Sequence, residues 1–175
     1  MEPVTPVKFL IAVLWNDRSS LATALTLLPK SWGDVDFSGP DHLFNLTDYY
    51  QAEMGGGLLR RLVSWSVLLP PESLVEAKLK CIEIERQLAC DQQRTINLDV
   101  GYLDHNKVVL GSVKYAGQKI HLGSGIYADM VARYRHGSYE PLEWSFPDFR
   151  DGRYAEELGT IRRIYLDQLR SARNA

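Results

Sequence analysis

The sequence contains few of the residues that hold metals or form disulfides, and its charges are nearly balanced. Two cysteines and four histidines are spread over 175 residues, and the formal net charge is −2. Cys81 and Cys90 fall on one predicted helix, about 13 Å apart along its axis, which excludes a disulfide between them. The histidines lack the spacing of a zinc site, so we expect no metal. The small net charge argues against a protein that binds nucleic acid through its overall charge.

Long apolar runs and export signals are missing too. The longest apolar stretches, such as Phe9 to Trp15, are too short to span a bilayer. The first residues, Met1-Glu-Pro-Val-Thr-Pro, lack the basic start and apolar run of a signal peptide. We therefore expect a cytoplasmic protein without a membrane partner.

Motifs of the common nucleotide-binding and hydrolytic enzymes are absent as well. The chain has no phosphate-binding loop of the form G-x-x-x-x-G-K-[ST], no G-x-S-x-G elbow and no H-E-x-x-H helix. The segment Gly123-Ser-Gly125-Ile-Tyr-Ala128 fits the loose dinucleotide pattern, but a strand rather than a helix is predicted to follow it. We interpret it as a tight turn or bulge. The motifs therefore assign no catalytic residue and no cofactor.

Hydrophobic patterning, in contrast, predicts most of the secondary structure. Residues 8–15 are apolar on both alternating faces, which is typical of a central strand covered on both sides. Apolar residues recur every three or four positions from Leu74 to Leu88 and predict a helix. The first six predicted elements are strand 8–15, helix 21–28, strands 34–37 and 58–69, helix 71–88 and strand 94–102. Their order is that of a ferredoxin-like βαββαβ core with an antiparallel sheet.

The C-terminal part is predicted to extend this core. Residues 107–114 and 118–122 suggest a β-hairpin that turns at 115–117, followed by a strand at 126–135 and a terminal helix at 154–170. These elements would extend the sheet or cover its other face. We predict an α+β fold in a single domain over residues 1–175, with the core at about 8–102 and the extension at about 103–175.

Polar side chains gather on the predicted strands in a way that suggests a site. Asn97 and Asp99 alternate with apolar residues on one strand, while Tyr127 and Asp129 share a face of another, and Lys114 flanks the hairpin. Acid, amide and basic groups on an open sheet face could bind a phosphate or a carboxylate. The alternative is that this is the solvent-exposed face of an antiparallel sheet.

A series of short phrases in the chain resembles a known family. The phrases are Thr47-Asp-Tyr-Tyr50 with Glu53-Met-Gly55, Leu59-Arg-Arg61, Lys78 with Glu85, Asn97-Leu-Asp-Val-Gly-Tyr102, Lys107-Val-Val-Leu110, Lys114, Gly125-Ile-Tyr-Ala128, and Glu140-Pro-Leu-Glu-Trp144 with Pro147-Asp148. Together they resemble, from about Lys8 to Arg150, the bacterial family catalogued as domain of unknown function 4416. The family has no established activity, so the resemblance implies no reaction.

The chain also departs from the family's usual pattern. After Lys114 the family tends to have an acidic residue and then a histidine–arginine pair, where this chain has Tyr115 and Gln118-Lys119. A proline is usual at the position of Val100 and a glutamate at that of Asp129. These departures favour a binding or structural role for this region over catalysis by an imidazole.

Two hypotheses of function follow, and both leave the oligomeric state and any enzymatic activity open. The first is a binding site for a small anionic ligand, a nucleotide or phosphorylated metabolite. The residues that we expect to contribute to it are Glu53, Arg61, Asn97, Asp99, Tyr102, Lys114 and Tyr127. The second is a protein–protein interaction module that uses the aromatic segment 139–149, with Trp144, Phe146 and Phe149. This segment could instead fold back onto the sheet.

Overall fold

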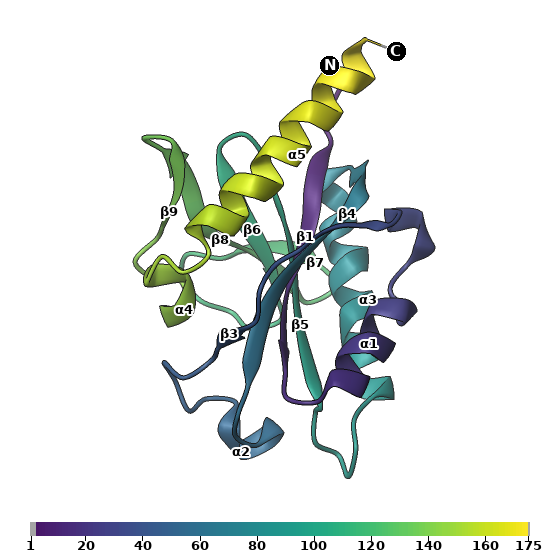
Figure 1. Cartoon of the computed structure of the whole chain (residues 1–175), viewed down its shortest axis with the longest axis vertical. Coiled ribbons are helices and arrows are strands. Elements are labelled where there is room, and N and C mark those ends of the chain that lie inside the picture. Colours follow the sequence, from purple (N-terminus) through teal and green to yellow (C-terminus); the bar gives the residue numbers. More distant parts are fainter. Residues whose placement is uncertain (1–2, 175) are drawn as a thin grey trace.

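The structure, a computed structural model, describes residues 3–174 and is a mixed α/β fold (Figure 1). Within those residues it has five α-helices and an antiparallel sheet of nine strands, which is larger than predicted. The strands are β1 (Val7–Trp15), β2 (Val35–Ser38), β3 (His42–Leu43), β4 (Leu59–Leu69), β5 (Ile96–Leu103), β6 (Lys107–Ser112), β7 (Ile120–Gly123), β8 (Ile126–Arg135) and β9 (Ser138–Pro141). The helices are α1 (Arg18–Leu27), α2 (Gln51–Met54), α3 (Leu74–Gln87), α4 (Pro147–Arg150) and α5 (Ala155–Arg173).

The sheet is built around β1. Its main path runs in the order β2-β4-β1-β5-β6-β8-β7, while β3 pairs with β4 and β9 pairs with β8. All nine residues of β1 are buried, as the apolar sequence on both of its faces predicts. Strands β4 and β5 flank β1 along nearly its whole length.

Helices cover both faces of the sheet (Figure 1). On one face α1 and α3 pack against Ile96, Leu98 and neighbouring apolar residues of β1 and β4. On the other face α5 lies across the sheet and packs through Ile161 and Tyr165. The predicted sheet extension and terminal helix are therefore both present, and the helix covers the face opposite α1 and α3.

Helix α3 matches the predicted periodicity but carries two charges on its buried side. Leu74, Cys81 and Ile84 are buried in the core, as the three-and-four spacing predicts. Lys78 and Glu85 are also buried, each 6% exposed, although residues of these types are rarely buried without a partner. Both side chains reach β5, where the sheet is interrupted.

The predicted hairpin of residues 107–122 is wrong. Strands β6 and β7 do not pair with each other, because β8 lies between them and pairs with both. Strand β7 instead forms a hairpin with β8, and the turn between them has positive φ at Gly123, Ser124 and Gly125. The prediction paired β6 with β7 because they are neighbours in the sequence. The tight turn at 123–125, with its positive φ angles, instead pairs β7 with β8.

The most important feature for a site is a division of the sheet between β5 and β6. These strands pair over three residues only: Gly101 pairs with Leu110, Tyr102 with Val109, and Leu103 with Val108. The stretch 96–100 of β5 therefore has a strand neighbour on the β1 side only. Gly101 lies where the strands separate, and a Cβ there would be 2.1 Å from the carbonyl oxygen of Val109. The backbones of β5 and β6 therefore approach each other too closely at this position for any residue other than glycine.

In residues 3–174, no helix is long and apolar enough to cross a membrane.

The two cysteines provide a direct test of this packing. Cys81 is fully buried, and its burial raises the pKa of the thiol to about 12, whereas Cys90 is exposed. Because thiolates are the reactive form, native protein should react quickly with an aromatic disulfide reagent at Cys90 and very slowly at Cys81. In denaturant both should react. Equal rates for both thiols in native protein would contradict the packing of α3.

Candidate functional site

A cavity of about 380 Å³ lies where the sheet divides. This volume is at the lower end of the range for small-molecule sites. Strands β5, β6 and β8, helix α3, the start of α4 and the loops before α2 and after β6 all contribute to its lining. The lining residues are Thr47, Tyr49, Tyr50, Lys78, Ile82, Glu85, Arg94, Asn97, Asp99, Leu110, Gly111, Ser112, Val113, Lys114, Lys119, Asp129, Phe146 and Pro147.

Lys78 and Glu85 of α3 take the place of the missing strand beside β5. Nζ of Lys78 donates to the carbonyl oxygen of Leu98 over 3.0 Å, and the amide of Leu98 donates to Oε1 of Glu85 over 2.5 Å. Both backbone hydrogen-bonding groups of Leu98 are thereby satisfied by side chains instead of by a strand. The stem of Lys78 passes close to Gly111 of β6, where a Cβ would be 3.2 Å from Cβ of Lys78. Burial raises the pKa of Glu85, and Lys78 opposes this effect.

Arg94 connects Glu53, Asn97 and Glu85 at the cavity. Its guanidinium binds Glu53 through two hydrogen bonds of 2.6 Å, donates to Oδ1 of Asn97 over 2.8 Å, and lies 3.6 Å from Oε2 of Glu85. The hydrogen bonds from Arg94 lower the pKa of Glu53. The same guanidinium lies 5.8 Å from the ring centre of Tyr50. Arg94 therefore fixes the orientation of Asn97 and leaves the amide nitrogen of that side chain for another acceptor.

Arg60 of β4 lies under the cavity and is completely buried. It donates over 3.1 Å to Asp99 and over 3.1 Å to Asp148, and it stacks on Phe44 with 4.6 Å to the ring centre. The hydroxyl of Tyr154 donates to the same Asp148 oxygen over 2.7 Å. Burial lowers the pKa of Arg60, but Asp148 and Asp99 outweigh it, so the guanidinium stays charged. The network joins β4, β5, α4 and the start of α5.

Lys119, Asp129 and Ser112 form the wall on the β8 side. Nζ of Lys119 lies 3.1 Å from Oδ2 of Asp129 and donates to Oγ of Ser112 over 2.9 Å. The hydroxyl of Ser112 in turn donates to the carbonyl oxygen of Lys114 and accepts from the backbone amide of Lys114. The paired ammonium cannot accept a proton from the serine, so this group suits binding better than nucleophilic chemistry.

Three polar groups of the lining lack a partner of opposite character among residues 3–174. Nδ2 of Asn97 and Oδ1 of Asp129 are buried without a hydrogen bond, although their residues are only 3% and 7% exposed. Lys114, in contrast, is exposed; it forms no ion pair, and its Nζ lies over the ring of Tyr49, 4.2 Å from its centre. Buried orphan groups are costly, and they are uncommon in folded proteins. These groups are the ones that a ligand would satisfy.

The comparisons with known proteins give one result. The profile described as "Domain of unknown function (DUF4416)" matches residues 5–165 of the 175. The chain belongs to this family. No curated protein and no solved structure matches the chain. The resemblance predicted from the short phrases is therefore confirmed, and for this DUF4416 member any function has to be argued from its own side chains.

The structure brings some of the predicted site residues together. Asn97, Asp99 and Lys114 line the cavity, and Glu53 lies behind it, bound to Arg94. Asn97, Asp99 and Asp129 are buried, so the alternative of a solvent-exposed sheet face is wrong for these three residues, whereas Lys114 is exposed. The loop before α2 and the segment around α4 cover this face, which strand periodicity cannot reveal.

The other predicted residues lie outside the lining. Arg61 points away from it and binds Asp41 over 2.8 and 2.9 Å. Tyr102 packs on Phe9, and Tyr127 packs on Tyr115 and His121. Arg61 and Tyr102 lie on the opposite face of the sheet from Asn97 and Asp99. Side chains alternate between the two faces along a strand, so in β5 Val100 and Tyr102 point away from the face of Asn97 and Asp99.

Sequence reasoning missed four charged residues of the cavity and one beneath it. These are Lys78, Glu85, Arg94, Lys119 and the underlying Arg60. The available signal was the position of Lys78 and Glu85, which stand four residues after Leu74 and Cys81 on the apolar side of α3. Charges on a buried stripe need partners, and so they indicate a polar interior.

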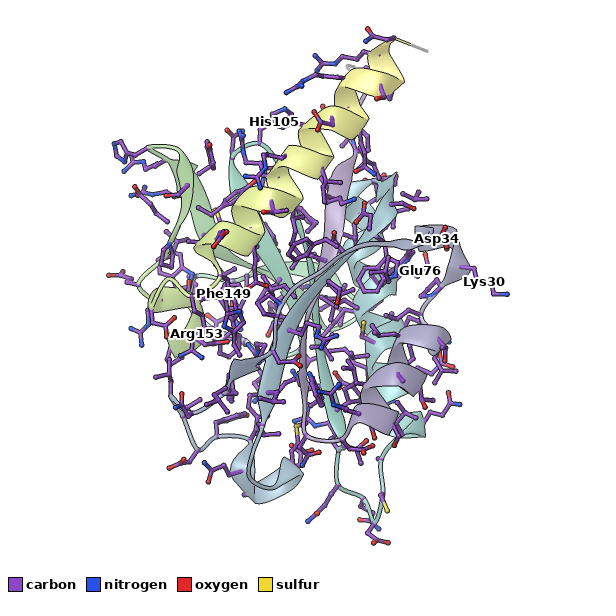
Figure 2. All side chains as sticks on the ribbon, in the orientation of Figure 1. Lys30, Asp34, Glu76, His105, Phe149 and Arg153 are labelled. Atoms are coloured by element: carbon purple, nitrogen blue, oxygen red, sulfur yellow. The ribbon has the colours of Figure 1, made fainter. Side chains whose placement is uncertain are left out.

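The aromatic segment 139–149 folds back onto the molecule. Tyr139 and Phe149 are buried in the core that α5 covers, and Phe149 belongs to the short helix α4 (Figure 2). Trp144 is 40% exposed, but its Nε1 donates to the carbonyl oxygen of Met130 over 2.8 Å.

Within residues 3–174 no group of three or more His, Cys, Asp or Glu side chains could hold a metal ion.

Replacing Arg60 should destabilise the protein strongly. In Arg60→Met the buried Asp148 loses its charge partner, so we expect the free energy of unfolding in urea to fall by about 3–5 kcal/mol. The neighbouring Arg61→Met is the control, because its pair with Asp41 is about one-fifth exposed on each side and should contribute less than about 1 kcal/mol. Equal losses in the two variants would contradict the network.

Glu85 and Glu53 should affect stability with opposite pH dependence. The raised pKa of Glu85 means that the folded state holds its proton more tightly than the unfolded chain. Its contribution is complete below the unfolded pKa of about 4.3 and is lost as pH rises through the higher folded value. The unfolding free energy of the protein minus that of Glu85→Gln should therefore fall as the pH rises above the unfolded pKa of about 4.3.

The opposite slope is expected for Glu53→Gln. The lowered pKa of Glu53 gives stability that is present above the unfolded pKa and is lost as pH falls. Denaturation curves at several pH values measure both slopes. The same sign of slope in both variants would contradict the assigned environments.

Proposed function

We propose that this protein binds a small anionic ligand, a nucleotide or phosphorylated metabolite, in the cavity between β5 and β6. The observation that carries the proposal is the unpaired ammonium of Lys114 beside a cavity that also contains the orphan amide nitrogen of Asn97. An ammonium and an amide N–H are the donors that phosphate oxygens accept from.

The charges of the lining favour an anion. Four basic and three acidic side chains line the cavity. Lys78 and Lys119 have carboxylate neighbours in the lining, and Arg94 is neutralised mainly by Glu53 behind it. Lys114 is the cation without such a neighbour. A ligand with a negative charge would complete the pairing.

The remaining lining suits a ligand with an apolar or aromatic part. Tyr49, Tyr50, Ile82 and Phe146 contribute apolar surface to the same cavity. Sites with mostly apolar walls and a few convergent polar groups are typical of small-molecule binding. Rings at the walls could stack on a base, which is why nucleotides belong in the first set of ligands to test.

The interaction-module hypothesis for residues 139–149 has less support. Tyr139 and Phe149 are needed in the core, and Trp144 already donates to Met130. We therefore keep it as the alternative to be considered if no small ligand binds.

Two further interpretations accompany the proposal. We infer that β1, α1, β2, β4, α3 and β5 form a ferredoxin-like unit, and the strand order β2-β4-β1-β5 supports this. We also propose a cytoplasmic location, since both cysteines are free thiols in this fold.

A thermal-shift screen against nucleotides, phosphorylated metabolites and divalent metals tests the proposal. A ligand at 100 times its dissociation constant should stabilise the protein by about 2.7 kcal/mol. Lys114→Ala should weaken binding by about tenfold or more, because a hydrogen bond to a charged group is lost. Its own stability should fall by no more than about 1 kcal/mol, since only the exposed contact with Tyr49 goes.

Lys30→Ala is the matched control. Lys30 is an exposed lysine on the opposite side of the molecule from Phe149 and Arg153 (Figure 2). It should bind ligand as the unchanged protein does. Equal weakening in both variants would indicate non-specific charge attraction, and an unfolded Lys114→Ala would indicate a structural role.

A further inference from the structure

The cavity holds unsatisfied groups of two opposite kinds at two different places. At one end, Asn97 and Lys114 have donors without acceptors, and at the other, Asp129 has an acceptor without a donor. An anion satisfies the first two and would be repelled by the third. The ligand of the proposed function therefore needs a second feature.

The positions of Asn97 and Asp129 in the sheet set how far apart these ends lie. Asp129 of β8 pairs with Leu110 of β6, which pairs with Gly101 of β5, four residues from Asn97. Two strand spacings across and four residues along place the two Cα atoms on the order of 15 Å apart. An inorganic phosphate ion cannot contact both side chains, whereas an extended molecule can.

Other contacts identify the anionic end. Arg94 holds Asn97 and lies near Tyr50, Tyr50 packs against Tyr49, and Tyr49 packs against Lys114. Asn97 and Lys114 thus flank the same tyrosine pair, although they come from different strands. At the Asp129 end, Lys119 already occupies Oδ2, so Oδ1 remains for a ligand.

Both orphan atoms are shielded in the structure, but small movements would present them to a ligand. The last torsion of Asn and Asp side chains is soft. Oδ1 of Asn97 is held by Arg94, so rotation about this torsion is limited while that hydrogen bond is kept. A donor that approaches Asp129 would likewise satisfy Oδ1 without breaking the pair of Oδ2 with Lys119.

We propose that the site selects a bipolar ligand, with a phosphate at the Asn97–Lys114 end and an amino or other N–H donor group at the Asp129 end. This inference rests on the proposed function and adds to it the class of ligand. Phosphorylated amines and nucleotides with an amino group on the base belong to this class, and simple sugar phosphates lacking a nitrogen donor do not.

Matched synthetic probes test the donor end separately from the phosphate. Hexyl phosphate and 6-aminohexyl phosphate share the phosphate and the chain and differ in the amine. Calorimetric titration should give at least about tenfold tighter binding of 6-aminohexyl phosphate, since a hydrogen bond to a carboxylate is gained. The shorter phosphoethanolamine should show no such advantage over ethyl phosphate, because it cannot reach from one end to the other.

Three variants assign the ends. Asp129→Asn should abolish the advantage of the amine, so that 6-aminohexyl phosphate binds no more tightly than hexyl phosphate. Asn97→Asp should weaken both hexyl probes, because an amide donor becomes a carboxylate. Asp41→Asn is the control, since Asp41 pairs with Arg61 outside the cavity, and it should change neither affinity.

Asp129→Glu keeps the test decisive if Asp129→Asn folds poorly. It retains the carboxylate on a longer side chain, so the preferred aminoalkyl chain should become shorter. Equal binding of the two hexyl probes, or an amine advantage that persists in Asp129→Asn, would overturn this inference and leave the proposed function standing. Failure of every phosphate probe and of the wider ligand screen to bind would overturn both.

Discussion

The site in this protein depends on how the backbone amide and carbonyl of one residue, Leu98, are satisfied. The amide and carbonyl of Leu98 face the side of β5 where a strand is missing, and buried backbone groups must have partners. Lys78 and Glu85 of α3 supply them. A helix that would otherwise only pack on the sheet thereby holds the strands apart, and the space between β5 and β6 becomes a cavity lined by charged side chains.

Burying so many charges is costly unless each is paired, and the pairing explains the surrounding architecture. Arg60 lies between Asp99 and Asp148, and it connects the floor of the cavity to α4 and to Tyr154 at the start of α5. The segment 139–149 is therefore held by a buried charge as well as by its aromatic residues. The network itself leaves Nε of Arg60 and Oδ1 of Asp148 without a hydrogen bond, whereas in the cavity lining the buried orphan atoms are those of Asn97 and Asp129.

Much of the fold could be predicted from sequence, because periodicity reports burial. The strand over 8–15, the helix over 71–88 and the strand over 126–135 all correspond to observed elements. The hairpin of 107–122 could not be predicted correctly, since the sequence does not show that β8 inserts between β6 and β7. Asn97 and Asp99 were found because polar residues alternate with apolar ones along a strand, and Lys114 because it flanks the predicted hairpin. Arg60 was missed because a buried arginine looks like surface until its two aspartates, 39 and 88 residues away, are placed beside it.

The most direct test of the central claim is a titration with 6-aminohexyl phosphate, monitored through the backbone amide signals of the protein in solution by nuclear magnetic resonance. Our account predicts that the largest shifts occur on the two edges of the division, at Asn97, Leu98, Lys114 and Asp129, with little change in α1 and β2. Shifts that concentrate in α1 and β2, or a titration without shifts at the division, would contradict the assignment of this cavity as the ligand site.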